Sequence, residues 1–252
     1  MFKTILTVAT LSVVSTAALA AENNALSQAG LAFSGNVALT SDYRYRGITQ
    51  TNNDPAVQGG FSLKQESGVY AGVWGSNVGF ASSLELDPYL GYSTELPITG
   101  KPVLDVGVWY YGYPSASDSN WAEYYARLTF PSLVVEGDSL FTNINYADDF
   151  LGDDADGDQL YVNAVYSFPL ADTGFGGVAG LGYTKTSDTV FGAGTSKDYL
   201  DWKVGVNYAV KSIDGFTAEL AAIGTDIDTK GYDKSDKRAV ETGAVFTLTK
   251  AF

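Results

Sequence analysis

Apolar and polar residues alternate with a period of two along most of the chain, and this pattern constrains the fold more than any other feature. In the stretch 199–210, for example, Leu200, Trp202 and Val204 share one face while Asp201 and Lys203 share the other. Successive side chains of a β-strand point to opposite faces, so the alternation predicts strands. Twelve such segments are predicted, at about 31–46, 57–65, 68–77, 83–95, 102–112, 121–133, 138–147, 158–168, 174–186, 198–210, 215–225 and 238–252.

Residues 1–20 predict a secretory signal peptide that is removed from the mature protein. Lys3 gives a charged start, residues 5–17 form an apolar run, and Ala18-Leu19-Ala20 supplies the small residues of a cleavage site. The run is shorter than the ~20 residues that a membrane-spanning helix requires. We therefore expect residues 21–252 to form a single domain.

The chain contains no cysteine and no histidine. Disulfides, thiolate metal sites and the side chain that most often acts as a general base are therefore excluded. With 45% hydrophobic residues the chain is too apolar to remain disordered. The net charge of −14 argues against nucleic acid as a partner. We expect neither a metal nor another cofactor.

Two all-β architectures explain the alternation. A soluble sandwich or lipocalin-like barrel turns its apolar face inward, whereas a transmembrane barrel turns that face toward lipid. Charged residues in mid-strand, such as Asp105 and Glu219, and predicted connections that alternate between short and long favour the transmembrane barrel. A further indication is a set of aromatic residues near strand ends on the apolar face, which would form interfacial girdles: Tyr43, Tyr45, Tyr92, Tyr110, Tyr124, Tyr146, Tyr166, Tyr208 and Phe252.

The predicted fold is therefore a closed antiparallel transmembrane β-barrel of about twelve strands, with short periplasmic turns and longer extracellular loops. The last segment alternates to the end of the chain, with Phe246, Leu248 and Phe252 on one face. Such an ending is similar to the signal that the outer-membrane barrel assembly machinery reads, although Lys250 departs from that pattern.

The stretch Ser34-Gly35-Asn36-Val37-Ala38-Leu39-Thr40-Ser41-Asp42-Tyr43-Arg44-Tyr45-Arg46-Gly47-Ile48-Thr49-Gln50-Thr51 resembles the opening of the TorF family, whose members are described as porins. Asp54-Pro55-Ala56-Val57-Gln58-Gly59-Gly60 continues the resemblance, and the region from Leu86 to Tyr92 is similar in character. The resemblance implies an outer-membrane β-barrel of Gram-negative bacteria with porin activity, and it implies no particular substrate.

If the apolar face meets lipid, the charged side chains of the other face line the interior. The candidate pore-lining residues are Asp42, Arg44, Arg46, Lys64, Glu85, Asp87, Asp105, Glu123, Arg127, Asp201, Lys203, Glu219 and Glu241. Either they line an open pore that passes small polar or ionic solutes, or they pair across strands and fill a plugged barrel. Because carboxylates outnumber bases in this set, an open pore would favour cations.

The sequence Asp42-Tyr43-Arg44-Tyr45-Arg46 has two interpretations of its own. Its arginines form either a basic ladder that contacts an anionic group of a solute, or the partners of Glu85, Asp87 and Glu241 on nearby strands. The structural interpretation is favoured, because buried charges require partners.

An acidic loop is the weak candidate for a metal site. It contains Asp148, Asp149, Asp153, Asp154, Asp156 and Asp158, which match a calcium site in composition but lack the spacing of an EF-hand. Such a loop could instead bridge cations to lipopolysaccharide, or simply be solvated.

Two other classes of function remain open. A non-conducting structural or adhesion barrel would use loop aromatics such as Trp121, Phe191 and Tyr232 to bind a partner. A hydrolase is the less favoured alternative, because only carboxylates such as Glu85, Asp87 and Glu123 are available for its chemistry, and no spacing selects a catalytic pair.

Overall fold

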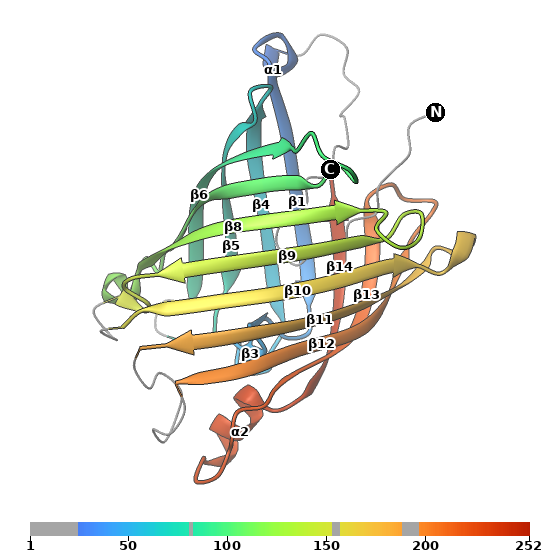
Figure 1. Ribbon diagram of the computed structural model, residues 1–252. Coiled ribbons are helices and arrows are strands. Elements are labelled where there is room, and N and C mark those ends of the chain that lie inside the picture. The colour runs from blue at the N-terminus through green and yellow to red at the C-terminus, as the bar shows by residue number, and fades with distance from the viewer. Residues whose placement is uncertain (1–24, 81–82, 153–156, 188–196) are drawn as a thin grey trace.

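The computed structural model describes residues 25–80, 83–152, 157–187 and 197–252, and twelve long strands of this part close into one antiparallel barrel (Figure 1). Each strand pairs with the next along the chain, and the last strand pairs with the first. The strands are β1 (Leu31–Thr40), β4 (Ala56–Gln65), β5 (Val69–Asn77), β6 (Leu84–Glu95), β7 (Val103–Tyr111), β8 (Trp121–Pro131), β9 (Ser139–Ala147), β10 (Gln159–Pro169), β11 (Phe175–Thr186), β12 (Asp198–Ala209), β13 (Phe216–Thr225) and β14 (Gly243–Ala251). The predicted fold class is confirmed.

The outer surface of the barrel is apolar and the interior is polar. Val57 on the outer face is 65% exposed, whereas the charged side chains of Glu85 and Asp87 inside are 1% and 0% exposed. The outer face also carries exposed Leu90 and Phe246. This arrangement is the reverse of a soluble protein, and so large an apolar surface requires a non-aqueous neighbour.

The two ends of the barrel differ in their connections. The end that carries α1 (Ala25–Gln28) and the C-terminus has the turns 66–68, 96–102, 132–138, 170–174 and 210–215, and we call it the terminal end (Figure 1). The six connections of the opposite, loop end join the strands across residues 41–55, 78–83, 112–120, 148–158, 187–197 and 226–242. Five of them are longer than the turns, as predicted, whereas 78–83 is no longer than the turns. Within the described residues, no helix is long and apolar enough to span a bilayer.

One of the turns at the terminal end is built around a buried carboxylate. Asp138 accepts hydrogen bonds from the backbone N–H groups of Leu133, Val134 and Val135 and from the hydroxyl of Tyr166. Burial opposes ionisation here, but these donors outweigh it and lower the pKa of Asp138. The turn between β8 and β9 is therefore held by an ionised aspartate.

The last residue closes the barrel. The backbone of Phe252 exchanges two hydrogen bonds with Gly35 of β1, with N···O distances of 2.8 and 3.0 Å. A side chain at position 35 would collide with the ring of Phe252, so glycine is required for the ring to lie there. The same ring stacks against Phe33 at a centroid distance of 6.3 Å.

Two predicted strand boundaries are wrong. The first strand ends at Thr40 rather than near residue 46, because the chain then turns into the barrel. The last strand begins at Gly243 rather than near 238, because residues Lys234–Val240 form the short helix α2. Asp233 caps this helix by accepting hydrogen bonds from the N–H groups of Ser235 and Asp236, which is the arrangement that favours a helix start.

The segment 41–55 folds back into the lumen as a small hairpin, β2 (Arg44–Tyr45) and β3 (Ile48–Thr49), which we call the lumen hairpin (Figure 1). Arg46 and Gly47 form its two-residue turn with φ values of 49° and 84°, which is the left-handed conformation that tight hairpins require. A Cβ atom at Gly47 would lie 2.5 Å from Thr225 Cγ2, so the tip touches the barrel wall at β13.

The lumen hairpin corrects two further predictions. Tyr43 and Tyr45 were expected on the lipid-facing side, but Tyr43 is only 6% exposed and both rings pack inside the barrel. The physical reason is the carboxylate of Asp42, which is buried and accepts hydrogen bonds from Thr49 and Thr51 and so folds the segment onto itself. If β1 continued as a strand past Thr40, the carboxylate of Asp42 and the hydroxyls of Thr49 and Thr51 would lose these hydrogen bonds.

Candidate functional site

Twelve of the thirteen candidate pore-lining residues lie in the interior of the barrel. Four ion pairs form among them: Arg44–Asp42 at 2.7 Å, Arg46–Glu123, Arg127–Asp105 at 3.7 Å, and Lys203–Glu219 at 2.5 Å. Lys64, Glu85, Asp87 and Asp201 also face the interior but form no ion pair within the described residues. Most lumen charges are therefore compensated by a neighbour, but Arg44 and Arg46 pair with Asp42 and Glu123 rather than with the carboxylates predicted for them.

Glu241 is the one candidate pore-lining residue whose side chain lies outside the lumen. Its side chain is exposed just after helix α2, before β14 begins, so its carboxylate does not line the lumen. The contact with Arg44 is made by the backbone carbonyl of Glu241, at 2.8 Å from Arg44 Nη1. Arg44 also donates to the carbonyl of Gly47 and to the amide oxygen of Asn53, which fixes it within the lumen hairpin.

Arg46 at the tip of the lumen hairpin attaches that hairpin to the opposite wall. Its guanidinium donates to the carboxylate of Glu123 on β8 and to the amide oxygen of Gln159 on β10. It also lies over the ring of Tyr161, 4.1 Å from the centroid. The amide of Asn145 donates to the second oxygen of Glu123. A buried ion pair is stable only with such additional hydrogen bonds.

Glu85 and Asp87 were predicted partners of the arginines, but they contact aromatic and backbone donors instead. The Tyr43 hydroxyl donates to Glu85 at 3.1 Å, and the indole of Trp109 donates to Asp87 at 2.9 Å. The N–H of Gly112 donates to the other oxygen of Asp87 at 3.1 Å. Glu85 thus ties the segment of the lumen hairpin to β6, and Asp87 ties the end of β7 and the loop after it to β6.

Aromatic side chains fill the loop end of the barrel on the side of β5 to β8. The rings of Tyr111 and Trp121 stack at 4.0 Å, and Phe150 meets Trp121 edge-on at 4.9 Å. Trp121 is only 3% exposed, so it does not fit its predicted use as an exposed partner-binding residue. Tyr232 is half-buried, and Phe191 lies outside the described residues.

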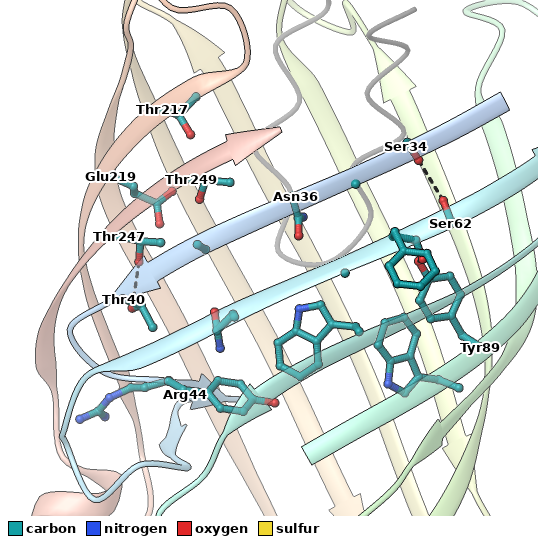
Figure 2. A pocket seen from close by; sticks show the side chains of 18 of the residues that line it. Ser34, Asn36, Thr40, Arg44, Ser62, Tyr89, Thr217, Glu219, Thr247 and Thr249 are labelled. Atoms are coloured by element: carbon teal, nitrogen blue, oxygen red, sulfur yellow. Dashed lines mark hydrogen bonds between the residues drawn. The ribbon is translucent and has the colours of Figure 1, made fainter. Parts of the chain in front are cut away.

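Two cavities of about 300 and 180 Å³ remain in the lumen, and the lumen hairpin forms part of the wall of both. They share Tyr43, Arg44, Trp74, Trp109 and Lys203 among their lining residues, so they adjoin each other. Figure 2 shows the larger one, with Arg44 at one end and a wall of hydroxyl-bearing side chains on β1, β13 and β14. The sequence alone did not single out most of these residues.

Glycines on the wall make room for inward-pointing aromatic rings. In the strand register, Tyr70 lies opposite Gly91, Tyr89 opposite Gly72, and Tyr125 opposite Gly107. A Cβ atom at each of these glycines would collide with a tyrosine ring. The rings therefore lie flat across the neighbouring strand, which keeps the centre of the lumen free.

The acidic loop gives no metal site in the part of the chain that the structure describes. Asp148, Asp149 and Asp158 are described, whereas Asp153, Asp154 and Asp156 lie outside the described residues. Among the described residues, no group of three or more carboxylates is arranged to hold a metal ion.

Comparisons with known proteins agree with the barrel. A sequence model described as "Bacterial protein of unknown function (Gcw_chp)" matches residues 24–252. No curated protein sequence matches the chain. Among solved structures, the NanC porin is 10% identical with a TM-score of 0.55, over 87% of this chain and 98% of that one. The KdgM porin is 13% identical with a TM-score of 0.53, over 87% and 99%. At identities this low the similarity shows the fold alone, which is that of a porin-like β-barrel.

Proposed function

This chain belongs to the Gcw_chp family of bacterial proteins of unknown function, and from that premise we propose that it forms a porin-like channel of the outer membrane for small polar or ionic solutes. The observation that carries the proposal is an apolar outer surface around a polar lumen that retains two adjoining cavities. The resemblance of residues 34–51 to the TorF family supports the same assignment.

In this proposal residues 1–20 direct export and are removed, and the terminal end of the barrel faces the periplasm. The long connections of the loop end then lie outside the cell, as in other outer-membrane barrels. The partners are outer-membrane lipid and lipopolysaccharide around the barrel, the assembly machinery during biogenesis, and the solutes themselves. The test is single-channel conductance of the purified barrel in planar bilayers.

We expect the channel to prefer cations weakly. Without Glu241 the lumen carries seven carboxylates and five basic groups, and most of them are paired. The preference therefore depends on the carboxylates without an ion-pair partner, of which Asp201 lines the smaller cavity. Walls of low dielectric constant focus the field of such a charge on the passing ions.

Asp201→Asn should accordingly shift the reversal potential in a salt gradient toward anion permeation. The shift should shrink as salt rises, because the Debye length falls from ~10 Å at 0.1 M to ~3 Å at 1 M. Asp172→Asn, in an exposed turn at the terminal end, is the matched control and should leave the reversal potential unchanged. An anion preference in the unmodified protein would contradict the proposal and assign the selectivity to Arg44 and Arg46.

Phe246, Leu248 and Phe252 carry the proposed assembly signal, and Phe252 also closes the sheet against β1. Deletion of Phe252 should slow insertion and lower the yield of barrel that shifts its mobility on a gel after heating. Lys250→Ala keeps the terminal ring and is the control. A deletion variant that inserts at the normal rate would remove this role from Phe252.

A non-conducting structural barrel is the second candidate, and the ion pairs around the lumen hairpin are the observation that favours it. A hairpin fixed by Arg46, Glu123 and Gln159 narrows the passage at the loop end. The conductance measurement separates the two functions, because a sealed barrel inserts into the bilayer without opening a conducting path.

A further inference from the structure

The larger cavity has one aromatic wall. Tyr89 and Trp109 line it as a parallel stack, with ring centroids 4.4 Å apart and an angle of 5° between the rings. Trp74 and Tyr70 extend the same wall on β5, next to these rings. The glycines opposite Tyr70 and Tyr89 let both rings lie across the neighbouring strand, so the rings on β5, β6 and β7 form one continuous side of the cavity.

The opposite wall is rich in hydroxyl and amide groups. Thr217, Thr247 and Thr249 on β13 and β14 lie there together with Asn36 (Figure 2). Asn207 on β12 also lines the cavity. In the smaller cavity the amide oxygens of Asn143 and Asn163, which face each other across β9 and β10, have no hydrogen-bond partner among the described residues. Such buried acceptors are costly unless a ligand or water donates to them.

The charged groups of these walls largely neutralise each other. In the larger cavity Lys203 pairs with Glu219, Arg127 with Asp105, and Arg44 with Asp42. The remaining charged group of its lining, Lys64, donates a hydrogen bond to the hydroxyl of Ser93 at 2.7 Å. A strongly charged ligand would have to break these pairs, which costs free energy in a site of low dielectric constant. The walls therefore favour a neutral ligand.

We propose that the lumen binds a neutral saccharide, with the C–H face of one sugar ring on the Tyr89–Trp109 wall and its hydroxyls on the threonine and asparagine wall. This inference rests on the proposed channel function and names its substrate class. A cavity of about 300 Å³ lies at the small end of ligand pockets and suits a single ring. An apolar aromatic solute would leave the hydroxyl and amide groups of the opposite wall without partners.

The test uses the purified full-length barrel in planar bilayers, with glucose, glucuronate and benzoate as probes. Glucose should reduce the ion current reversibly and saturably, and should do so at lower concentration than the other two. Tyr89→Leu should weaken the glucose block about tenfold, as the loss of one ring contact does. Tyr92→Leu, on the outer face of the same strand and 41% exposed, is the matched control and should keep the block.

Thr249→Val, which removes one hydroxyl from the opposite wall at nearly constant volume, is a second variant in case Tyr89→Leu fails to fold. A conducting barrel on which glucose has no effect, or which glucuronate or benzoate blocks more strongly, would overturn the saccharide inference and leave the channel intact. If the barrel does not conduct, the channel proposal fails, and a glucose-induced change in the intrinsic tryptophan fluorescence, to which Trp74 and Trp109 of the cavity wall contribute, tests binding independently. The absence of that change would overturn the inference.

Discussion

Excision of the lumen hairpin should raise the single-channel conductance of the barrel several-fold. Tyr43 and Gln50 lie at the base of the hairpin, where the N–H of Gln50 donates to the Tyr43 carbonyl at 2.7 Å. Residues 44–49 can therefore be replaced by two glycines without moving either end. The excision removes Arg44, Tyr45 and Arg46 from the wall of the cavities, so the passage widens at the loop end.

The excised variant should also carry Asp42→Asn and Glu123→Gln, because the carboxylates of Asp42 and Glu123 would otherwise be left buried without Arg44 and Arg46. Heat-dependent gel mobility checks that the barrel still folds. A deletion of the same net length, residues 228–231 in the connection before the cap of α2, is the control and should leave the conductance unchanged. Equal conductance with and without the lumen hairpin would show that another part of the lumen limits the current.

Most of the barrel could be predicted because strand alternation is a local property. Ten of the twelve predicted segments agree with a strand to within two residues at each end, since burial of alternate side chains leaves the same signal in every strand. The alternation continues through Tyr43 and Tyr45, however, and there it predicted the lipid-facing side for two rings that lie inside the barrel. The residues that fold this segment inward, Asp42 and Thr51, contact each other across a turn that periodicity does not detect.

The site could be predicted only in part, because its geometry depends on the register between strands. The charged residues of the lumen are visible in the sequence as the polar face of each strand. The partners of these residues are not visible in the sequence. Arg46 at the tip of the lumen hairpin, for example, pairs with Glu123 on β8, a strand that is not adjacent to the hairpin in the sequence. The sequence likewise does not indicate that Tyr89 lies opposite Gly72, because this pairing follows only from the register of β5 and β6.

Arg46 holds the lumen hairpin in place, and its removal should have the largest effect on stability of any single lumen substitution. Arg46→Ala leaves the carboxylate of Glu123 buried and without its cation, and breaking such a pair costs about 3–5 kcal/mol in free energy of unfolding. Urea unfolding of the barrel in lipid vesicles measures this cost.

A double substitution separates the loss of the ion pair from the loss of the side chain. Arg46→Met together with Glu123→Gln removes both charges at similar volume, and its stability should return most of the way to that of the unmodified protein. Lys101 and Glu95 form the control pair, 3.0 Å apart, with side chains 72% and 55% exposed. Lys101→Ala should cost no more than about 1 kcal/mol, because water screens that pair. If Arg46→Ala costs as little as Lys101→Ala, the lumen hairpin is held by its packing and hydrogen bonds, and the ion pair with Glu123 does not anchor it.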